Sequence, residues 1–290
     1  MTPASAAAAP ALAARYWRSR PGLLVLFCLA FFAALYLYPL AKLFVWSLYG
    51  PKLGLANYER LFTQASPFIA FRNTLDIAVI VTLVCLALGY PIAYLMTTVG
   101  PRARAAISLL VLVPFWTSIL VRTYAWIVIL GKNGIVNQAL TDWGVVARPL
   151  SLLYNMFGVQ VGLSHVLLPF MVFPLYGVMA RIDMRLVRAA RSLGASPARA
   201  FLHVFLPLSL PGVAAGCVLV FVLGVGAYVT PALLGGEGEV TLATLIELMI
   251  RDLLDWGFGA TLGVMLLTVV GTLFVAFSAA LGLDRLTGRG

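Results

Sequence analysis

The chain has 290 residues, of which 62% are hydrophobic and 10% are charged. A soluble domain of this length carries roughly a quarter charged residues, so the composition excludes an ordinary soluble fold. The net charge of +10 would suggest nucleic acid as the partner of a soluble protein. In a membrane protein, basic residues gather in the cytoplasmic loops instead. We therefore expect an integral membrane protein, surrounded by lipid bilayer and without a nucleic-acid partner.

Six segments with few or no charges are long enough to cross a bilayer, because about 20 apolar residues span it as a helix. An alanine- and proline-rich cytoplasmic tail is expected over 1–22 and a short cytoplasmic tail over 284–290. One all-α transmembrane domain of about six helices occupies 23–283 between them. The expected helices are 23–48, 74–96, 107–130, 157–179, 213–234 and 260–281.

The basic residues divide unequally between the two sets of loops. If both termini are cytoplasmic, twelve arginines lie inside and six basic residues lie outside. The excess of positive charge inside predicts an N-in, C-in topology. The inside set is Arg15, Arg18, Arg20, Arg102, Arg104, Arg181, Arg185, Arg188, Arg191, Arg199, Arg285 and Arg289. The outside set is Lys52, Arg60, Arg72, Lys132, Arg148 and Arg251.

Two ionisable residues lie within the expected second and third helices, Asp76 near the outer end and Arg122 in the middle to outer part. Charges inside a span are costly, which makes both residues candidates for a solute path. Trp116, Tyr124 and Trp126 add aromatic faces that attract an ammonium group. Two alternatives stay open: Asp76 and Arg122 pair with each other or reach the interface, and the aromatic residues form an interfacial belt.

The inner segment 181–206 predicts a helix, a glycine turn and a second helix. Apolar residues recur at helical spacing on each side of Gly194, which stands where a helix needs a left-handed stop. Ser196 and Pro197 follow as an N-cap and a first-turn proline. This pattern fits a docking element, or an amphipathic hairpin anchored on lipid. The small pair Ala189 and Ala190 favours docking, because it permits close approach of another backbone.

An acidic outer segment precedes the sixth helix and includes a short helix expected over 242–254. It either steers a cation or a binding protein or is a solvated face, and the second interpretation is favoured. Its acidic residues are Glu237, Glu239, Glu247, Asp252 and Asp255.

The inner segment resembles the cytoplasmic signature loop of ABC importer permeases, described as Glu-Ala-Ala, three residues, Gly, nine residues and Ile-x-Leu-Pro. Here Arg188-Ala189-Ala190 precedes Gly194-Ala195 at that spacing, and Val204-Phe205-Leu206-Pro207 ends the motif. Arg188 replaces the usual glutamate and Val204 the usual isoleucine. Segments over 73–75, 89–91, 114–126, 168–171 and 230–236 are similar to spermidine/putrescine-type permeases.

The resemblance implies a type I importer permease in the bacterial inner membrane. An ATPase dimer would dock on the loop, a second permease subunit, usually a different chain, would lie alongside, and an extracytoplasmic binding protein would deliver the solute. No phosphate-binding loop or other catalytic motif is found, so ATP and magnesium belong to the ATPase and this chain is expected to bind no cofactor or metal. Polyamines are the favoured solute. An opine, an aminophosphonate or ferric ion remains an alternative, and a stand-alone secondary transporter is a more distant one.

Overall fold

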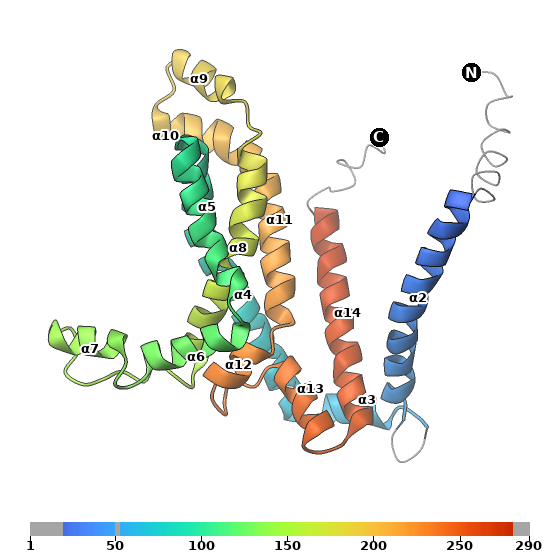
Figure 1. Ribbon diagram of the computed structural model, residues 1–290. Coiled ribbons are helices and arrows are strands. Elements are labelled where there is room, and N and C mark those ends of the chain that lie inside the picture. Colours follow the sequence, from blue (N-terminus) through green and yellow to red (C-terminus); the bar gives the residue numbers. More distant parts are fainter. Residues whose placement is uncertain (1–19, 50–52, 281–290) are drawn as a thin grey trace, which may run out of the picture.

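The computed structural model describes residues 20–49 and 53–280, and within these ranges the chain consists of helices joined by turns. This confirms the predicted all-α fold (Figure 1). The predicted tail over 284–290, and all of the first tail except 20–22, lie outside the described residues. The helices are α2 (Arg20–Ser47), α3 (Ala56–Thr63), α4 (Ala65–Thr98), α5 (Pro101–Trp116), α6 (Ile119–Leu130), α7 (Ile135–Asp142), α8 (Met156–Met179), α9 (Met184–Ser192), α10 (Pro197–Ala200), the π-helix η1 (Phe201–Phe205), α11 (Leu206–Val225), α12 (Val229–Leu234), α13 (Leu242–Arg251) and α14 (Trp256–Ala280).

Six segments of the described chain are long and apolar enough to cross a membrane, which agrees with the predicted number. Four of the expected spans correspond to α2, α4, α8 and α14, although α4 begins at Ala65 and not at Thr74. The expected third span is broken into two helices, and the boundaries of the fifth span are shifted.

The third span, predicted as one helix over 107–130, is broken at Thr117 and Ser118. Pro114 has no N–H to donate to the preceding turn, which weakens the end of α5. Thr117 is extended, and the Ser118 hydroxyl accepts a hydrogen bond from the N–H of Leu120 at 3.3 Å, so it caps a new helix. In Figure 1, α5 runs along α8, whereas α6 and α7 extend sideways.

The fifth span begins earlier and ends earlier than the predicted 213–234. Helix α10 continues through the π-turn of η1 into α11, and the chain breaks after Val225. In the π-turn, the N–H of Leu206 bonds to the carbonyl of Phe201, five residues back. Pro207 follows at once and cannot donate to the preceding turn, so the wider π-turn accommodates a site where regular α-helical bonding is lost.

The core of the molecule lies where α4, α8 and α11 pack together. Met171 of α8 fits between two glycines, one on each neighbouring helix. A Cβ at Gly89 would lie 2.9 Å from Met171 Cγ, and a Cβ at Gly216 would lie 2.7 Å from Met171 Sδ. Small residues at these points let the three helices approach closely, as membrane helices commonly do.

Figure 1 shows α2 and α14 beside this core and not within it, and one part of α14 packs in a second buried cluster with α13 and α3. Helix α2 is exposed along most of its length and contacts α14 near one end. There Trp46 and Trp256 meet edge to face with ring centroids 5.5 Å apart, and the Thr261 hydroxyl donates to the Ser47 carbonyl at 3.2 Å.

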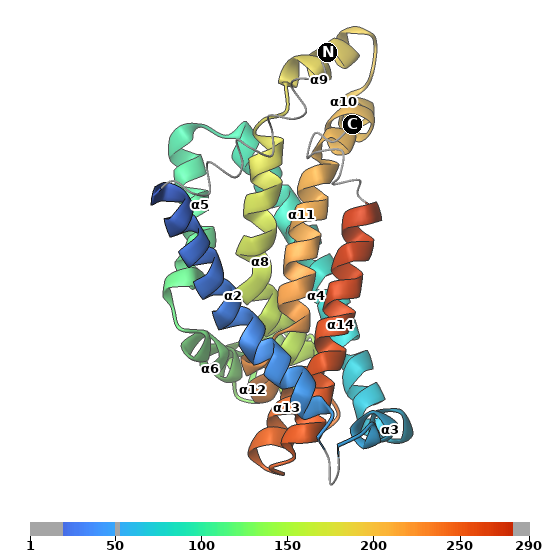
Figure 2. The same cartoon turned by 90° about the vertical axis from the view of Figure 1, so that its right-hand side faces the viewer.

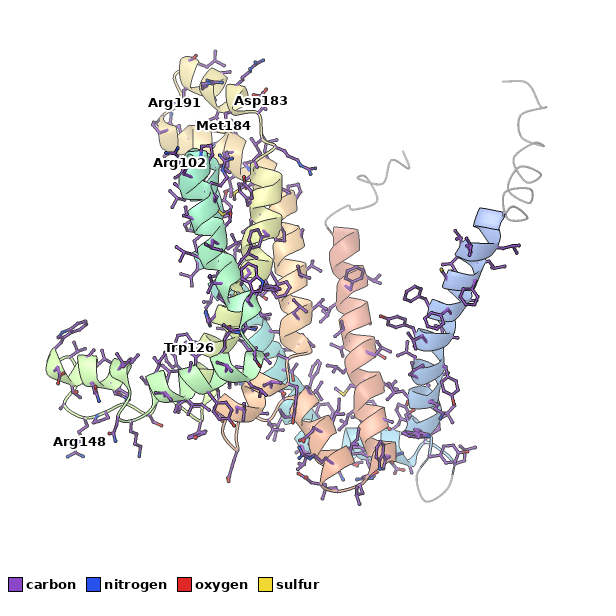
Figure 3. The ribbon with its side chains drawn as sticks, viewed as in Figure 1. Arg102, Trp126, Arg148, Asp183, Met184 and Arg191 are labelled. Atoms are coloured by element: carbon purple, nitrogen blue, oxygen red, sulfur yellow. The ribbon has the colours of Figure 1, made fainter. Side chains whose placement is uncertain are left out.

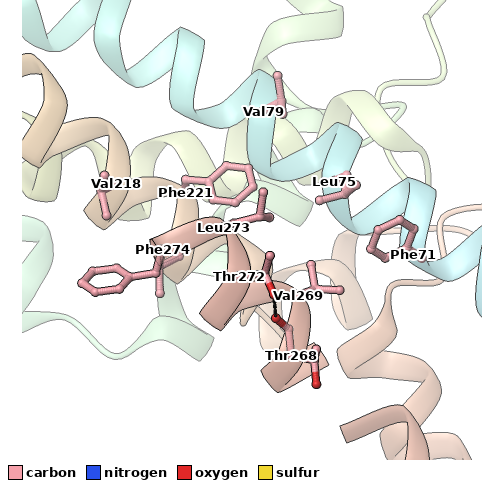
Figure 4. Close-up of a pocket in the computed structure, with 11 residues that line it drawn as sticks. Phe71, Leu75, Val79, Val218, Phe221, Thr268, Val269, Thr272, Leu273 and Phe274 are labelled. Carbon is pink, nitrogen blue, oxygen red and sulfur yellow. Dashed lines mark hydrogen bonds between the residues drawn. The ribbon is translucent and has the colours of Figure 1, made fainter. Parts of the chain in front are cut away.

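A groove of about 520 Å³ lies between α14 and the pair α4 and α11 (Figure 4). Its lining is apolar except for two threonines. The hydroxyl of Thr268 donates to the Val264 carbonyl at 2.8 Å, and that of Thr272 donates to the Thr268 carbonyl at 2.7 Å. Both hydroxyls are therefore satisfied by their own helix, and the groove offers a charged solute no free polar group.

Figure 3 shows labelled arginines at both ends of the bundle. Arg102 and Arg191 lie at the end that carries α9 and α10, which we call the hairpin end, and Arg148 lies at the opposite end. This separation agrees with the division of basic residues made from the sequence. The assignment of the hairpin end to the cytoplasm remains a prediction.

Candidate functional site

The segment 181–206, called the α9–α10 hairpin below, begins and ends its helices with defined caps. The Asp183 carboxylate accepts from the N–H of Arg185 at 2.9 Å at the start of α9. At its end, the N–H of Ala195 bonds to Ala190 O at 3.1 Å and the N–H of Gly194 bonds to Arg191 O at 3.0 Å. This pair of bonds is a Schellman motif.

Gly194 supplies the left-handed residue that this motif needs, with φ at +91°. A Cβ added at Gly194 would meet nothing within 4 Å, so the requirement for glycine comes from the backbone alone. Ser196 then caps α10, accepting from the N–H of Arg199 at 3.3 Å, and Pro197 takes the first helical position. The predicted sequence of helix, glycine turn and helix is present in the structure.

Helix α9 has no fully buried residue. Val187 and Ala190 are half-buried on the side that faces the rest of the chain, whereas Ala189 is exposed. Leu186 is 50% exposed and Leu193 is 89% exposed. The apolar stripe of the sequence is Leu186, Ala189, Ala190 and Leu193. All of these except Ala190 are exposed, which leaves them available to a partner.

An aromatic cluster joins the root of the hairpin to the end of α4. Phe201 and Phe205 stack with ring centroids 5.7 Å apart, and Tyr94 meets them edge to face at 5.6 and 5.1 Å. Tyr90 contacts Phe201 at 6.2 Å, and its hydroxyl lies 2.9 Å from that of Ser209 on α11. These contacts hold the hairpin, α4 and α11 together, and we call this cluster of rings the aromatic joint.

The remaining motif residues lie at this joint. Val204 is half-buried in η1, Leu206 is the half-buried first residue of α11, and Pro207 is exposed in its first turn. The sequence predicts no role at this joint for Tyr90, which entered only through the similar segment 89–91, or for Tyr94, because only the spatial meeting of α4 with η1 gives them one.

A second cluster lies where α6 crosses α8. Trp126 donates its indole N–H to Nδ1 of His165 at 3.1 Å, and the two ring centroids are 5.7 Å apart. Arg122 precedes Trp126 by one helical turn, so both side chains lie on the same face of α6. The buried Nε of Arg122 has no hydrogen-bond partner among the described residues. We call Arg122, Trp126 and His165 the polar cluster.

Trp126 and His165 of the polar cluster line a pocket of about 440 Å³ between α4, α6 and α8. The buried hydroxyl of Ser164, which has no hydrogen-bond partner within the described chain, belongs to a lining residue. Polar and aromatic groups thus meet apolar walls in one pocket, as is typical of small-molecule sites. The lining residues are Val84, Leu88, Trp126, Phe157, Gln160, Val161, Ser164, His165 and Leu168.

Of the five predicted solute-path residues, only Trp126 lines this pocket; Arg122 belongs to the polar cluster beside it, and the other three lie elsewhere. Asp76 pairs with Arg72 one turn before it on α4, with Nε and Oδ2 3.5 Å apart, and not with Arg122. Trp116 is 72% exposed at the end of α5, and Tyr124 is 56% exposed on α6. His165 lines the pocket instead, although the sequence alone gave it no role in a solute path.

Most acidic residues of the segment before α14 form ion pairs or hydrogen bonds with other residues of this chain. Glu247 pairs with Arg251 at 3.0 Å, and Asp255 pairs with Arg60 at 2.8 Å. A carboxylate oxygen of Glu239 accepts from the N–H of Gly236 at 3.0 Å. These pairs favour a solvated structural face over a surface that steers cations.

Six candidate spans, an exposed capped hairpin at one end and a polar cluster where α6 crosses α8 together fit a membrane-embedded transport subunit. Residues 6–286 match the family described as the inner membrane component of binding-protein-dependent transport systems. The chain belongs to this family, and it is a multi-pass protein of the inner membrane.

Several curated proteins are similar to this chain. The spermidine/putrescine transport system permease protein PotB of Haemophilus influenzae is 36% identical, over 82% of this chain and 83% of the relative. PotB of Escherichia coli is 35% identical, over 77% of this chain and 81% of the relative. A Salmonella paratyphi A relative, provisionally named for 2-aminoethylphosphonate transport, is 28% identical over 78% of this chain and 80% of the relative.

Two solved structures share the fold. A chain of a bacterial ABC transporter involved in the import of alginate matches with a TM-score of 0.77 and 18% identity, covering 96% of this chain and 99% of that chain. A chain of the alginate transporter in complex with its periplasmic protein matches with a TM-score of 0.77 and 19% identity, covering 95% and 97%. At these identities the likeness establishes the fold alone.

Proposed function

We propose that this chain is the membrane-spanning subunit of an ATP-driven importer for polyamines such as spermidine and putrescine. ATP hydrolysis takes place on a separate ATPase dimer, and this chain binds neither ATP nor magnesium. An extracytoplasmic binding protein delivers the solute. Membership of the family and the similarity to the two PotB proteins support this proposal.

The observation that carries the proposal is the capped, exposed α9–α10 hairpin and its aromatic joint. An importer whose ATPase is a separate chain needs an element that receives the motion of that ATPase. The hairpin presents an apolar stripe outside the bundle, and Tyr94 and Phe205 connect its root to α4. A displacement of the hairpin therefore moves the bundle itself, which is the requirement for opening and closing a path.

The second membrane subunit finds its place beside α2 and α14. Helix α2 is apolar and exposed along most of its length, and the groove along α14 is apolar. Either a different permease or a second copy of this chain fits such a surface. Leu37 is exposed on α2, so a Leu37→Cys variant can be cross-linked to the neighbouring subunit. The mass of the cross-linked product shows whether that subunit is a different permease or a second copy of this chain.

The polar cluster is the part of the solute path that this chain offers. Trp126 presents an aromatic face and Ser164 a hydroxyl, which suit an ammonium group. Arg122 carries positive charge into the same region and suits an anionic group better. A solute that bears both an amine and an acid, such as an aminophosphonate, is therefore the second candidate.

Uptake in a bacterial strain that lacks its own polyamine importers tests the proposal. The strain expresses this chain with the other subunits of its transporter, and radiolabelled spermidine or putrescine is supplied. We expect uptake that requires the ATPase subunit and is unaffected by excess 2-aminoethylphosphonate. Loss of uptake under that competitor would move the assignment to the second candidate. Uptake without the ATPase would contradict the proposal.

A further inference from the structure

We infer that the ATPase partner receives α9 in a groove whose rim carries carboxylates, and that Arg185 and Arg188 pair with them. The inference rests on the proposed function and adds the chemistry of the partner surface to it.

The hairpin carries much more positive than negative charge. Within 181–199 there are five arginines, Arg181, Arg185, Arg188, Arg191 and Arg199, against the single acid Asp183. The Asp183 carboxylate is used as the N-cap of α9. The ion pairs of the described residues join Arg60 to Asp255, Arg72 to Asp76 and Arg251 to Glu247, so none of the five arginines is neutralised within the described chain.

The arrangement on α9 places two of these charges beside the apolar stripe. Arg185 and Arg188 are three residues apart and therefore neighbours on the helix surface. Both are exposed, on the side turned away from half-buried Val187 and Ala190. Ala189 follows Arg188 on the exposed face, next to exposed Leu186 and Leu193. The helix thus offers one cationic edge and one apolar edge, and a complementary surface has an acidic rim and an apolar floor.

A protein groove fits this face better than a lipid surface. Ala189 and Ser192 are the small residues of the exposed side, and small residues permit close approach of another backbone, whereas a helix lying on lipid uses bulky apolar residues. In Figures 1 and 2, α9 is the outermost element of the hairpin end and projects past α5, α8 and α11.

Reversal of one charge tests the inference in the purified transporter. Wild type and Arg188→Glu are assembled with their own ATPase in nanodiscs of phosphatidylcholine alone, and retained ATPase is measured across a salt series. We expect roughly tenfold weaker retention for Arg188→Glu. We also expect wild-type retention to weaken as salt rises. Arg188→Lys keeps the charge and should stay close to wild type. Arg148→Glu makes the same change of charge at the opposite end and controls for net charge.

A reciprocal change identifies the partner carboxylate. Cross-linking from a Ser192→Cys variant first locates the facing surface of the ATPase. The acidic residues of that surface are then replaced by arginine one at a time. One of these replacements should restore retention of Arg188→Glu and weaken retention of the wild type. A merely misfolded Arg188→Glu chain would not be rescued in this way.

Three results would overturn the inference. Retention of Arg188→Glu equal to or stronger than wild type would mean that the facing groove is not acidic, while the proposed function would stand. An effect of Arg188→Glu that occurs only when phosphatidylglycerol is added would assign the arginines to lipid headgroups. If wild type retains no ATPase and transports solute without ATP, the proposed function fails and the inference with it.

Discussion

Tyr94 and Phe205 meet edge to face, with ring centroids 5.1 Å apart and an angle of 84° between the ring planes. Tyr94 lies near the end of α4, and Phe205, which is 1% exposed, closes the π-turn at the root of the hairpin. The contact therefore joins an exposed element to a helix of the core. In such an arrangement the hairpin cannot tilt without displacing either α4 or the two rings.

Removal of the ring at Tyr94 should separate ATP hydrolysis from transport. Edge-to-face pairs contribute about 0.5–1.5 kcal/mol each beyond the area they bury, and Tyr94 makes two of them. We expect Tyr94→Leu to lower uptake to about a tenth of the wild-type rate while ATP is still hydrolysed. Uptake and phosphate release measured on the same proteoliposomes give the ratio of solute to ATP.

Tyr94→Phe is the control, because it keeps the ring. We expect it to transport at close to the wild-type rate with an unchanged ratio of solute to ATP. An unchanged ratio in Tyr94→Leu as well would mean that the aromatic joint holds the fold together but does not transmit motion.

Substitution of Gly194 should damage the hairpin through its backbone. The φ of +91° is unfavourable for any residue with a Cβ, at a cost of about 1–2 kcal/mol for left-handed backbone. We expect Gly194→Asp and Gly194→Val to insert into the membrane normally but to lose most ATP-dependent uptake. Protein level in membranes and uptake of radiolabelled spermidine are the measurements.

Ala195 provides the matched control for the glycine. Its N–H completes the Schellman motif, but its own φ is not in the positive range. Ala195→Ser should therefore transport almost normally. Equal losses at both positions would show that any change in this turn is harmful, and that the left-handed residue has no special role.

The amino-acid sequence was informative wherever local rules decide the structure. The turn at Gly194 and the cap at Ser196 follow from residue type alone, and the structure has both. The number of spans followed from apolar length. These features depend on neighbours within one or two helical turns, so no tertiary information was needed.

Features that depend on several local signals or on distant contacts were missed. Ser118 is a good N-cap, but it stands within an apolar run, and the length of that run suggested one unbroken helix. The π-turn before Pro207 was also not predicted, because it too lies within a mostly apolar run that suggested regular helix. Trp126 was a solute-path candidate because of its ring, yet its partner His165 lies 39 residues later in the chain. Tyr94 had no signal in the sequence at all.

Acid should weaken the attachment of α3 to α14. Partial burial acts to raise the pKa of the Asp255 carboxyl, but hydrogen bonds from Arg60 and from the N–H of Phe258 outweigh it and bring the pKa below its ordinary value. The ionised form is then favoured in the folded protein. Its contribution to stability is complete above a pH of about 4 and is lost as the pH falls through the lower folded pKa.

The size of this effect is small because both side chains are partly exposed, at 41% for Arg60 and 32% for Asp255. We expect Asp255→Asn to cost about 0.2–1 kcal/mol at neutral pH and the difference from wild type to shrink in acid. Thermal unfolding in detergent at a series of pH values measures it. Asp142→Asn removes an exposed carboxyl without an ion pair in the described chain and should show no such trend.

Loss of the indole N–H at Trp126 should alter solute affinity without altering assembly. Trp126→Phe keeps an aromatic ring but no longer donates to His165 Nδ1, a bond of 3.1 Å. A hydrogen bond contributes about 0.5–1.5 kcal/mol net, so we expect the KM for uptake to rise about two- to tenfold while the amount of retained ATPase is unchanged. Trp143→Phe makes the same substitution at an exposed position beyond α7 and should leave KM unaltered. An unaltered KM in Trp126→Phe, accompanied by lower thermal stability, would assign the polar cluster to the packing of α6 on α8 and would remove it from the solute path.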